Sequence, residues 1–301
     1  MQIESVAPAE LDDILARVLA APGNDRVAPQ GQVGSFVRYV SACKLEWNAW
    51  RCRRGDRKTA ALFVLLLPGK TAIAIFPAPD ARDVVPEDQQ ALLAAGIRQL
   101  RERELHYLQA LVETQAEGKR RLLEVAGFRH LTQLIYLRRD ATYPWCDPPE
   151  PGEASWLAYD KAHHSAFVRV VAETYQNSQD CPELSGLRPV EDALAAHKAA
   201  GVFDPSLWEL ARVADEYVGC VLMARLTHGS LMELVYMGVV SSQRRRGIGS
   251  RLIRRALAQC RAVGIGELTA VVDQRNTPAR QLYARFGFRP EAFREAYVCA
   301  R

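Results

Sequence analysis

The chain has 301 residues, of which 49% are hydrophobic and 25% charged, and its formal net charge is +4. This composition is typical of a folded globular protein, excludes a disordered or fibrous chain, and at this length favours two domains. The longest apolar run, Ala60 to Pro68, is about half as long as a membrane helix. Met1 to Asp12 lacks the basic and apolar regions of a secretory signal, so we expect a cytoplasmic protein with no membrane partner.

The cysteines and the overall charge also exclude some classes of site. The seven cysteines are scattered, with no C-x-x-C pair and no histidine at zinc-finger spacing. We therefore expect thiols in a reducing compartment and no metal site. The weak positive charge does not favour nucleic acid as a partner, although arginines cluster locally.

The first half is predicted to begin with a helix and to continue with strands and helices. Apolar periodicity, together with bounding Pro and Gly residues, supports this assignment. The predicted order is a helix at Pro8 to Leu19, strands at Glu46 to Arg53, Thr59 to Leu67 and Thr71 to Phe76, a helix at Pro86 to Glu104, a strand at Tyr107 to Val112, a helix at Gly118 to Ala126 and a strand at Thr132 to Leu137.

A Pro-rich segment at residues 141–154 is the predicted linker between an N-terminal domain, residues 1–140, and a C-terminal domain, residues 155–301. In each half, strands that suit antiparallel pairing are followed by strands that alternate with helices. This order predicts an α/β fold in each half, with a mixed, mainly antiparallel sheet flanked by helices. The second half is predicted to contain helices at Ser155 to Glu173 and Val190 to Ala200, strands at Leu207 to Val213, Tyr217 to Leu226 and Met232 to Val240, a helix at Gly247 to Val263, a strand at Leu268 to Val272, a helix at Pro278 to Phe286 and a strand at Ala292 to Val298.

A short internal match supports a duplicated fold. The triplet Gly127-Phe128-Arg129 returns as Gly287-Phe288-Arg289, 160 residues later. Each triplet lies between a predicted helix and a predicted strand, where glycine is the expected C-cap residue. The same order of elements on both sides of the Pro-rich segment therefore predicts two copies of one fold.

The most informative segment is Glu233 to Leu257, where a strand leads into a turn that opens a helix. Gly247 and Gly249 remove Cβ atoms beside the amides of the first helical turn, and several arginines add positive charge. Such a helix N-terminus binds a pyrophosphate. A Walker A loop would need a Lys after the last Gly and a dinucleotide fingerprint would need a third Gly, and the segment has neither.

A third type of phosphate-binding loop fits the segment better than the Walker A loop or the dinucleotide fingerprint. Arg244 to Gly249 satisfies R/Q-x-x-G-x-G/A and resembles the acyl-CoA loop of the GNAT (GCN5-related) acetyltransferases. The later phrase Leu268 to Phe288 resembles the opposite wall of that family's CoA cleft. The resemblance implies two tandem GNAT-like domains with a splayed strand pair in the second. The complete motif in the second repeat also resembles the mycothiol synthases, although no residue indicates their acceptor.

The resemblance implies a set of site residues in the second half. Tyr283 is expected to protonate the departing thiolate and Glu233 to take a proton from the attacking amine, while Asn276 is expected to contact pantetheine. The residues expected to bind acetyl-CoA are Met237, Val239, Arg244, Arg245, Arg246, Gly247, Ile248, Gly249, Ser250 and Asn276.

The two catalytic assignments have structural alternatives. Tyr283 could instead be a core residue of an amphipathic helix. If side chains alternate strictly along the strand, Glu233 lies on the same side as Met237 and Val239. Instead of lying in the cleft, Glu233 could stand at the end of its strand in water.

The weaker assignments lie outside the two motifs. Tyr175, Asp180 and Glu183 belong to a polar stretch that could bind a substrate ammonium or form an ordinary loop. The arginines of the helix after the loop, Arg251 to Arg255, could contact the CoA 3′-phosphate or form a solvated face.

The first half lacks the corresponding motif. Ile73 to Leu93 contains no Gly, and Leu123 and Ala116 stand 160 residues before Tyr283 and Asn276. We therefore expect a degenerate repeat that shapes or covers the acceptor site. The predicted function is an acetyl-CoA-dependent N-acetyltransferase that acts on a primary amine, of a small molecule in preference to a protein. A non-catalytic acetyl-CoA sensor or scaffold is the open alternative.

Overall fold

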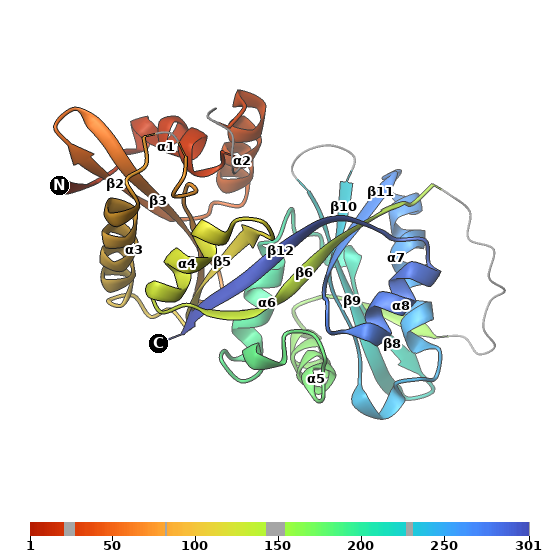
Figure 1. Ribbon diagram of the computed structural model, residues 1–301. Helices are drawn as coiled ribbons and strands as arrows, with labels where there is room; N and C mark the ends of the chain where they lie inside the picture. The colour runs from red at the N-terminus through yellow and green to blue at the C-terminus, as the bar shows by residue number, and fades with distance from the viewer. Residues whose placement is uncertain (21–27, 82, 143–153, 227–230, 301) are drawn as a thin grey trace. The chain divides into compact units, whose positions relative to one another are not determined.

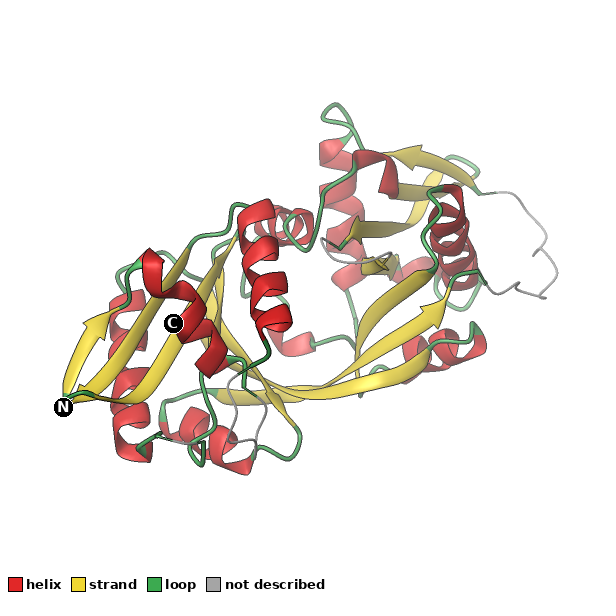
Figure 2. Cartoon of the chain, turned by 90° about the horizontal axis from the view of Figure 1, so that it is seen from above, coloured by secondary structure: helices red, strands yellow, loops and turns green. Residues whose placement is uncertain are grey.

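The computed structural model describes residues 1–20, 28–81, 83–142, 154–226 and 231–300. The chain divides into two compact units. Unit 1 comprises Met1–Gln133 together with Arg294–Arg301, and unit 2 comprises Leu134–Phe293. The predicted linker falls largely on residues 143–153, which lie outside the described residues. In each unit helices pack on both faces of the strands (Figures 1 and 2).

Unit 1 is built around a long apolar strand, β3, whose residues are buried on both faces because helices α1 and α3 pack against it. A strand buried on both faces is apolar at successive positions, as β3 is from Ala60 to Leu66. The strands of the unit are β1 (Gln2–Ser5), β2 (Trp47–Arg54), β3 (Arg57–Leu67), β4 (Thr71–Ile75) and β5 (Tyr107–Glu113), and its helices are α1 (Leu11–Val18), α2 (Gln30–Ala42), α3 (Pro86–Leu100) and α4 (Glu117–Val125).

Unit 2 has two apolar cores, one on each face of its sheet. Helix α7 packs on the face that presents Val221, Met223 and Leu234, and helix α5 packs on the face that presents Cys220 and Leu222. The remaining strands of the chain are β6 (Arg129–Asp140), β7 (Ser155–Ala158), β8 (Trp208–Val213), β9 (Glu216–Arg225), β10 (Leu231–Val239), β11 (Glu267–Asp273) and β12 (Arg289–Ala300), and the helices are α5 (His164–Tyr175), α6 (Val190–Lys198), α7 (Ile248–Ala262) and α8 (Thr277–Arg285).

The two halves exchange their last strands. Strand β6, which ends the first half, pairs antiparallel with β11 of unit 2, and β12, which ends the second half, pairs antiparallel with β5 of unit 1. The two pairings have the same register once the 160-residue offset between the repeats is applied. Glu267 lies opposite Asp140, and Tyr107 and Ala300, the residues 160 positions before and after these two, lie opposite each other. The compact units therefore do not follow the linear division predicted from the sequence, because each sheet is completed by the other half.

The predicted repeat is visible in the backbone. Gly127 and Gly287 both have positive φ, 89° and 79°, and both end a helix. In each case the next residue donates its amide to the carbonyl five residues before it, Phe128 to Leu123 at 2.9 Å and Phe288 to Tyr283 at 3.0 Å. This is the Schellman type of helix end, in which a left-handed residue is needed and glycine is favoured.

One predicted element needs correction, and two observed elements were not predicted. The segment predicted as a helix from Ser155 to Glu173 contains strand β7 before helix α5 begins at His164. Trp156 and Leu157 lie among apolar neighbours that suit either element, and pairing with β8 decides in favour of the strand. Helix α2 and strand β1 have no counterpart in the prediction, because their short apolar patterns are weak by themselves.

Two kinds of feature are absent from the described residues. None of their helices is long and apolar enough to cross a membrane. Within the same ranges, no group of three His, Cys, Asp or Glu side chains is placed to hold a metal ion.

Candidate functional site

Strands β10 and β11 pair over only part of their length. Leu231 to Leu234 pair in parallel with Glu267 to Ala270, and the described pairing stops there although the strands continue to Val239 and Asp273. Beyond Leu234, the edge of β10 that faces β11 therefore leaves its peptide groups outside the sheet ladder. Such groups are costly to bury without a partner, so this edge is suited to a ligand with amide groups.

A cavity of about 440 Å³ lies along this open edge. Its size is within the range of small-molecule sites in proteins. It is lined by both strands, by the loop before α7, by α8 and by the segment after α5. Its lining includes Thr174, Asp180, Tyr236, Met237, Val239, Arg244, Arg245, Gly249, Asn276 and Tyr283. Many of the predicted site residues thus come together, although Glu233 is outside this lining.

The loop before α7 has the geometry of an anion site. Gly247 is the N-cap residue of the helix and has a φ of 77°. The first amides of the helix, those of Ile248 to Ser250, precede the first helical hydrogen bond, which Arg251 donates to Gly247. These amides and the positive end of a fifteen-residue helix can hold a phosphate group.

Arg244 has a positioning role in the structure. Its guanidinium donates to the carbonyl oxygens of Thr174 and Asn177, each at 2.9 Å, and of Gln176 at 2.8 Å. It also donates to Val239 at 3.2 Å. The side chain therefore joins the phosphate loop to the end of α5, and this geometry does not support the predicted contact with the cofactor.

The other predicted loop residues divide into exposed and packed positions. Arg245 and Arg246 are exposed, and Arg245 lines the cavity. Ile248 belongs to the apolar core, and the buried hydroxyl of Ser250 accepts a hydrogen bond from Arg285. Met237 and Val239 pack partly against the same core and also line the cavity.

A β-bulge in β10 overturns the predicted alternation. Leu234 lies opposite Met223, but the next paired residue is Tyr236, opposite Leu222, so Val235 is an extra residue. Each bulge reverses which face the following residues occupy. Glu233 therefore lies on the face of Tyr236 and Gly238, and the prediction that it shares a face with Met237 and Val239 is wrong.

The carboxyl group of Glu233 lies where burial disfavours its charged form. It lies between Ala224 of β9 and Thr269 of β11. Burial raises its pKa from the usual 4.5 to about 7. A carboxyl group with such a pKa can both bind and release a proton near neutral pH.

Tyr283 is buried beneath the cavity wall, only 7% exposed, with its ring 5.1 Å from that of Phe288. Burial, reinforced by the negative charge of Asp180, raises the pKa of its phenol further above 10. The hydroxyl is therefore protonated at neutral pH. Tyr283 therefore packs in the core and also lines the cavity, and its role as the acid stays a prediction.

Asn276 has two structural contacts. Its side-chain oxygen accepts from the amide of Ala279 at 3.2 Å and so caps α8, and its side chain also bonds Asp180. Asp180 accepts from the amide of Asp273 at 3.0 Å. Burial nevertheless raises the pKa of Asp180 above its usual value. The predicted pantetheine contact of Asn276 remains a prediction.

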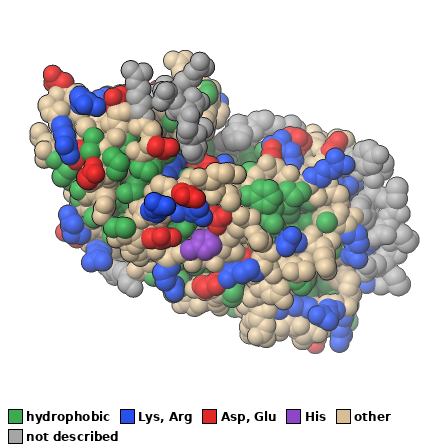
Figure 3. Space-filling model, in the orientation of Figure 1, with side chains coloured by type: hydrophobic (Ala, Val, Ile, Leu, Met, Phe, Trp, Pro, Cys, Tyr) green, Lys and Arg blue, Asp and Glu red, His purple; other side chains and the backbone are tan. Residues whose placement is uncertain are grey.

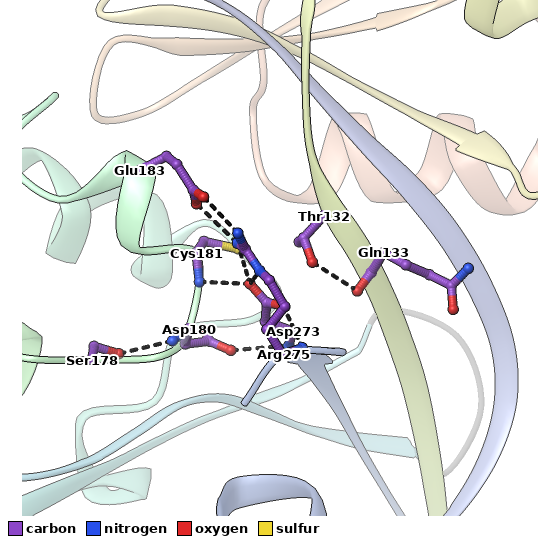
Figure 4. Close-up of polar contacts among 8 residues, drawn as sticks. All are labelled: Thr132, Gln133, Ser178, Asp180, Cys181, Glu183, Asp273 and Arg275. Atoms are coloured by element: carbon purple, nitrogen blue, oxygen red, sulfur yellow. Dashed lines mark hydrogen bonds and ion pairs between the residues drawn. The ribbon is translucent and has the colours of Figure 1, made fainter. Parts of the chain in front are cut away.

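A charged cluster joins the segment after α5 to the end of β11 (Figure 4). Arg275 lies between Glu183, to which it donates at 2.5 and 2.9 Å, and the fully buried Asp273, at 2.7 Å. Asp273 also accepts from the amide of Cys181 at 3.0 Å. The carboxylate of Glu183 is thus engaged by Arg275, which lowers its pKa, and this contact does not favour its predicted role toward a substrate ammonium.

The sequence did not point to several residues in and beside the cavity. Tyr236 packs edge-on against the predicted Tyr175, with ring centroids 5.5 Å apart, and its hydroxyl is 2.8 Å from the Thr174 hydroxyl. The polar pair Asp273 and Arg275, directly after an apolar strand and before Asn276, could have been found as an unusual polar ending. Tyr236 gave no such signal, because the bulge that orients it is invisible in the sequence.

The arginines after the loop include an internal ion pair. Arg255 donates to the buried Glu209 with two hydrogen bonds of 2.5 Å and lies over the Trp156 ring. This residue is therefore part of the packing of α7 on the sheet. Over much of the face shown in Figure 3, acidic side chains lie between the basic ones. That view gives no support to a continuous basic surface among the described residues, and the absence of a nucleic-acid partner stays a prediction.

In unit 1 apolar residues stand at the places of two predicted site residues. Strands β4 and β5 also pair only at their beginnings, Thr71 to Ile73 with Tyr107 to Gln109. At the position of Tyr283, Leu123 is fully buried, and at the position of Asn276 stands the buried Ala116. A cavity of about 370 Å³ nevertheless lies beside Ala116 and Lys119. The degenerate character of this repeat therefore stays a prediction.

Comparison with known proteins identifies relatives of both the motif and the fold. The family model described as Acetyltransferase (GNAT) family matches residues 136–288. A mycothiol acetyltransferase of Beutenbergia cavernae is 28% identical over 193 residues, which cover 60% of this chain and 63% of that protein. The chain spans less than two thirds of the length of the curated relatives it matches.

Two solved structures share the fold over nearly the whole chain. A GCN5-related N-acetyltransferase from Sphaerobacter thermophilus has a TM-score of 0.69 at 19% identity, covering 99% of this chain and 95% of that one. A tandem GNAT protein from the clavulanic acid biosynthesis pathway has a TM-score of 0.56 at 14% identity, covering 99% and 98%. The fold is therefore that of two GNAT-like domains in tandem, as predicted.

Proposed function

Because the chain belongs to the acetyltransferase (GNAT) family, we propose that it transfers the acetyl group of acetyl-CoA directly to a primary amine of a small molecule. The observation that carries this proposal is the cavity on the open edge of β10, with the anion-binding helix end and the buried Tyr283 on its wall. The names of the relatives, mycothiol acetyltransferases, support a small-molecule acceptor.

The residues around the cavity fit acetyl-CoA. The amides from Ile248 to Ser250 would bind the pyrophosphate, with the exposed Arg245 and Arg246 adding positive charge. The open edge of β10, at Met237 to Val239, offers peptide groups to the amides of the pantetheine arm. When bound, acetyl-CoA would supply an electrophilic carbonyl carbon and a thiolate leaving group.

Two protons must move during the transfer. As the new C–N bond forms and the C–S bond breaks, the amine loses a proton and the departing sulfur gains one. Tyr283 is the proposed donor to sulfur, because its hydroxyl is protonated at neutral pH and lines the cavity. Glu233 is the proposed acceptor of the amine proton, directly or through water, because its pKa is about 7.

Asp180 is a second candidate for the proton acceptor. It lines the cavity, which Glu233 does not, and burial raises its pKa. The isosteric variants Glu233→Gln and Asp180→Asn separate the two. Loss of the ionisation that activates the enzyme from the pH profile of kcat/KM in only one of them identifies the base, and an unchanged profile in both refutes a carboxylate base.

The proposal is tested first by calorimetric titration of acetyl-CoA into the parent and into Gly247→Asp and Gly247→Asn variants. Asp and Asn have the same shape and both tolerate a positive φ, so the pair differs chiefly in charge. We expect one site in the parent, near-parent affinity in the Asn variant, and at least about tenfold weaker binding in the Asp variant because of repulsion from the pyrophosphate. Absence of binding to the parent would refute the proposal.

A second measurement separates transfer from binding. Thiol release from acetyl-CoA is followed with a panel of primary amines, using parent protein and Tyr283→Phe. Acceleration by an amine in the parent, reduced in the variant, supports catalysis with Tyr283 as the acid. Binding without any acceleration would favour the acetyl-CoA sensor or scaffold.

A further inference from the structure

The hydroxyl of Tyr236 is held in one orientation by its neighbour on α5. Thr174 Oγ1 lies 2.7 Å from the carbonyl oxygen of Val171 and 2.8 Å from Tyr236 Oη. A carbonyl oxygen cannot donate, so the first contact requires the threonine proton. Thr174 has only one such proton, and both contacts are satisfied only if Tyr236 donates to Thr174.

This assignment leaves Tyr236 with free acceptor capacity and no proton to offer. A phenol hydroxyl has one donor hydrogen, and here that hydrogen points to Thr174. The ring is fixed on its sides by Tyr175, edge-on at 5.5 Å, and by His197, stacked at 5.2 Å. These contacts fix the position of the oxygen, and its proton can turn away from Thr174 only by giving up that hydrogen bond.

Tyr236 belongs to the lining of the cavity in which the transfer is proposed to occur. Thr174 and Asp180 line the same cavity. Gly238 brings the strand close to α5, since a Cβ there would lie 2.6 Å from Thr174 Cβ. The wall that β10 shares with α5 therefore presents hydrogen-bond acceptors, the Tyr236 oxygen and the Asp180 carboxylate.

We infer that Tyr236 accepts a hydrogen bond from the nitrogen of the acceptor and, with Asp180, selects acceptors that carry several N–H groups. The inference rests on the proposed acetyl transfer and adds a specificity residue to it. The attacking amine must have a free lone pair, and a neutral primary amine then has two N–H groups, one for each oxygen, whereas its N-methyl analogue has one N–H and a hydroxyl or thiol acceptor has one hydrogen. A primary amine is thus favoured over an alcohol or a thiol.

The test compares the parent with Tyr236→Phe and Tyr217→Phe. The acceptor is the primary amine that the parent acetylates fastest from a panel, alongside its N-methyl analogue, which has one N–H fewer. We expect Tyr236→Phe to raise KM for the primary amine about threefold to tenfold, since one hydrogen bond to the nitrogen is lost. Its effect on the N-methyl analogue should be smaller, and its affinity for acetyl-CoA should match that of the parent.

Tyr217→Phe is the matched control, because it removes a phenol hydroxyl from the same apolar cluster at a residue outside the cavity lining. It should therefore have the KM of the parent. Equal losses by Tyr236→Phe with both amines, or no change in KM, would overturn the inference while leaving acetyl transfer intact. If the parent binds acetyl-CoA but acetylates no amine in the panel, the proposed function and this inference both fail.

Discussion

The Glu233→Gln variant should differ from the parent in how its stability depends on pH. In the folded protein the pKa of Glu233 is about 7, and in the unfolded chain it returns to about the usual 4.5. At 1.36 kcal/mol for each tenfold change in the ionisation constant, this difference in pKa corresponds to about 3 kcal/mol of unfolding free energy. The pKa is raised by burial of the carboxyl group, so burial is also the cause of this energy.

The sign follows from proton binding. Between these two pKa values the folded protein keeps a proton that the unfolded chain has released, so the free energy of unfolding falls as the pH rises. Above about pH 7 the loss is complete, because the carboxylate is then ionised in both states. Gln has no such proton, so the variant should gain up to about 3 kcal/mol on the parent across this window.

Urea unfolding of both proteins at several pH values from about 5 to about 8 measures this difference. Glu216→Gln is the matched control, because Glu216 is exposed at the start of β9 and should not show the effect. A difference between parent and Glu233→Gln that stays constant with pH would refute the raised pKa. It would also remove the main argument for Glu233 as the proton acceptor.

Three other variants test the structure. Arg275→Gln leaves a fully buried carboxylate without its cation and should cost about 3 kcal/mol of unfolding free energy, measured by urea titration, and an unchanged midpoint would contradict the cluster. Gly238→Ala forces a Cβ against Thr174 and should cost about 1 to 3 kcal/mol, whereas Gly266→Ala, with its nearest neighbour at 3.6 Å, should be nearly neutral in thermal unfolding. Deleting residues 294–301 removes the partner that β5 pairs with at seven positions, so amide exchange in β5 should accelerate, and unchanged protection would exclude the strand exchange.

The glycine turn before α7 is present in the structure as predicted, because it depends only on residues that are close together in the sequence. Gly247 takes a positive φ at a helix start, and the amides after it precede the first helical hydrogen bond whatever the rest of the fold does. Gly127 and Gly287 likewise end their helices as predicted. Turns and helix ends of this kind depend on a few neighbouring residues, so they can be predicted from the sequence.

The side chains around the loop were harder to assign. Arg244 was expected at the cofactor but donates to backbone carbonyls at the end of α5, some 70 residues earlier in the chain. Glu183 was expected at the substrate but is engaged by Arg275. A long charged side chain can reach many partners, and the choice among them depends on which segments the fold brings near.

The sequence by itself determined the α/β class, the repeat and the glycine turn that opens helix α7, since these follow from composition, periodicity and residues close together in the chain. Only the tertiary structure decided which face Glu233 occupies, because one extra residue at Val235 reverses the alternation. It also decided that β6 and β12 are exchanged, because strand pairing joins residues more than a hundred positions apart, and a strand's own sequence does not specify its partner.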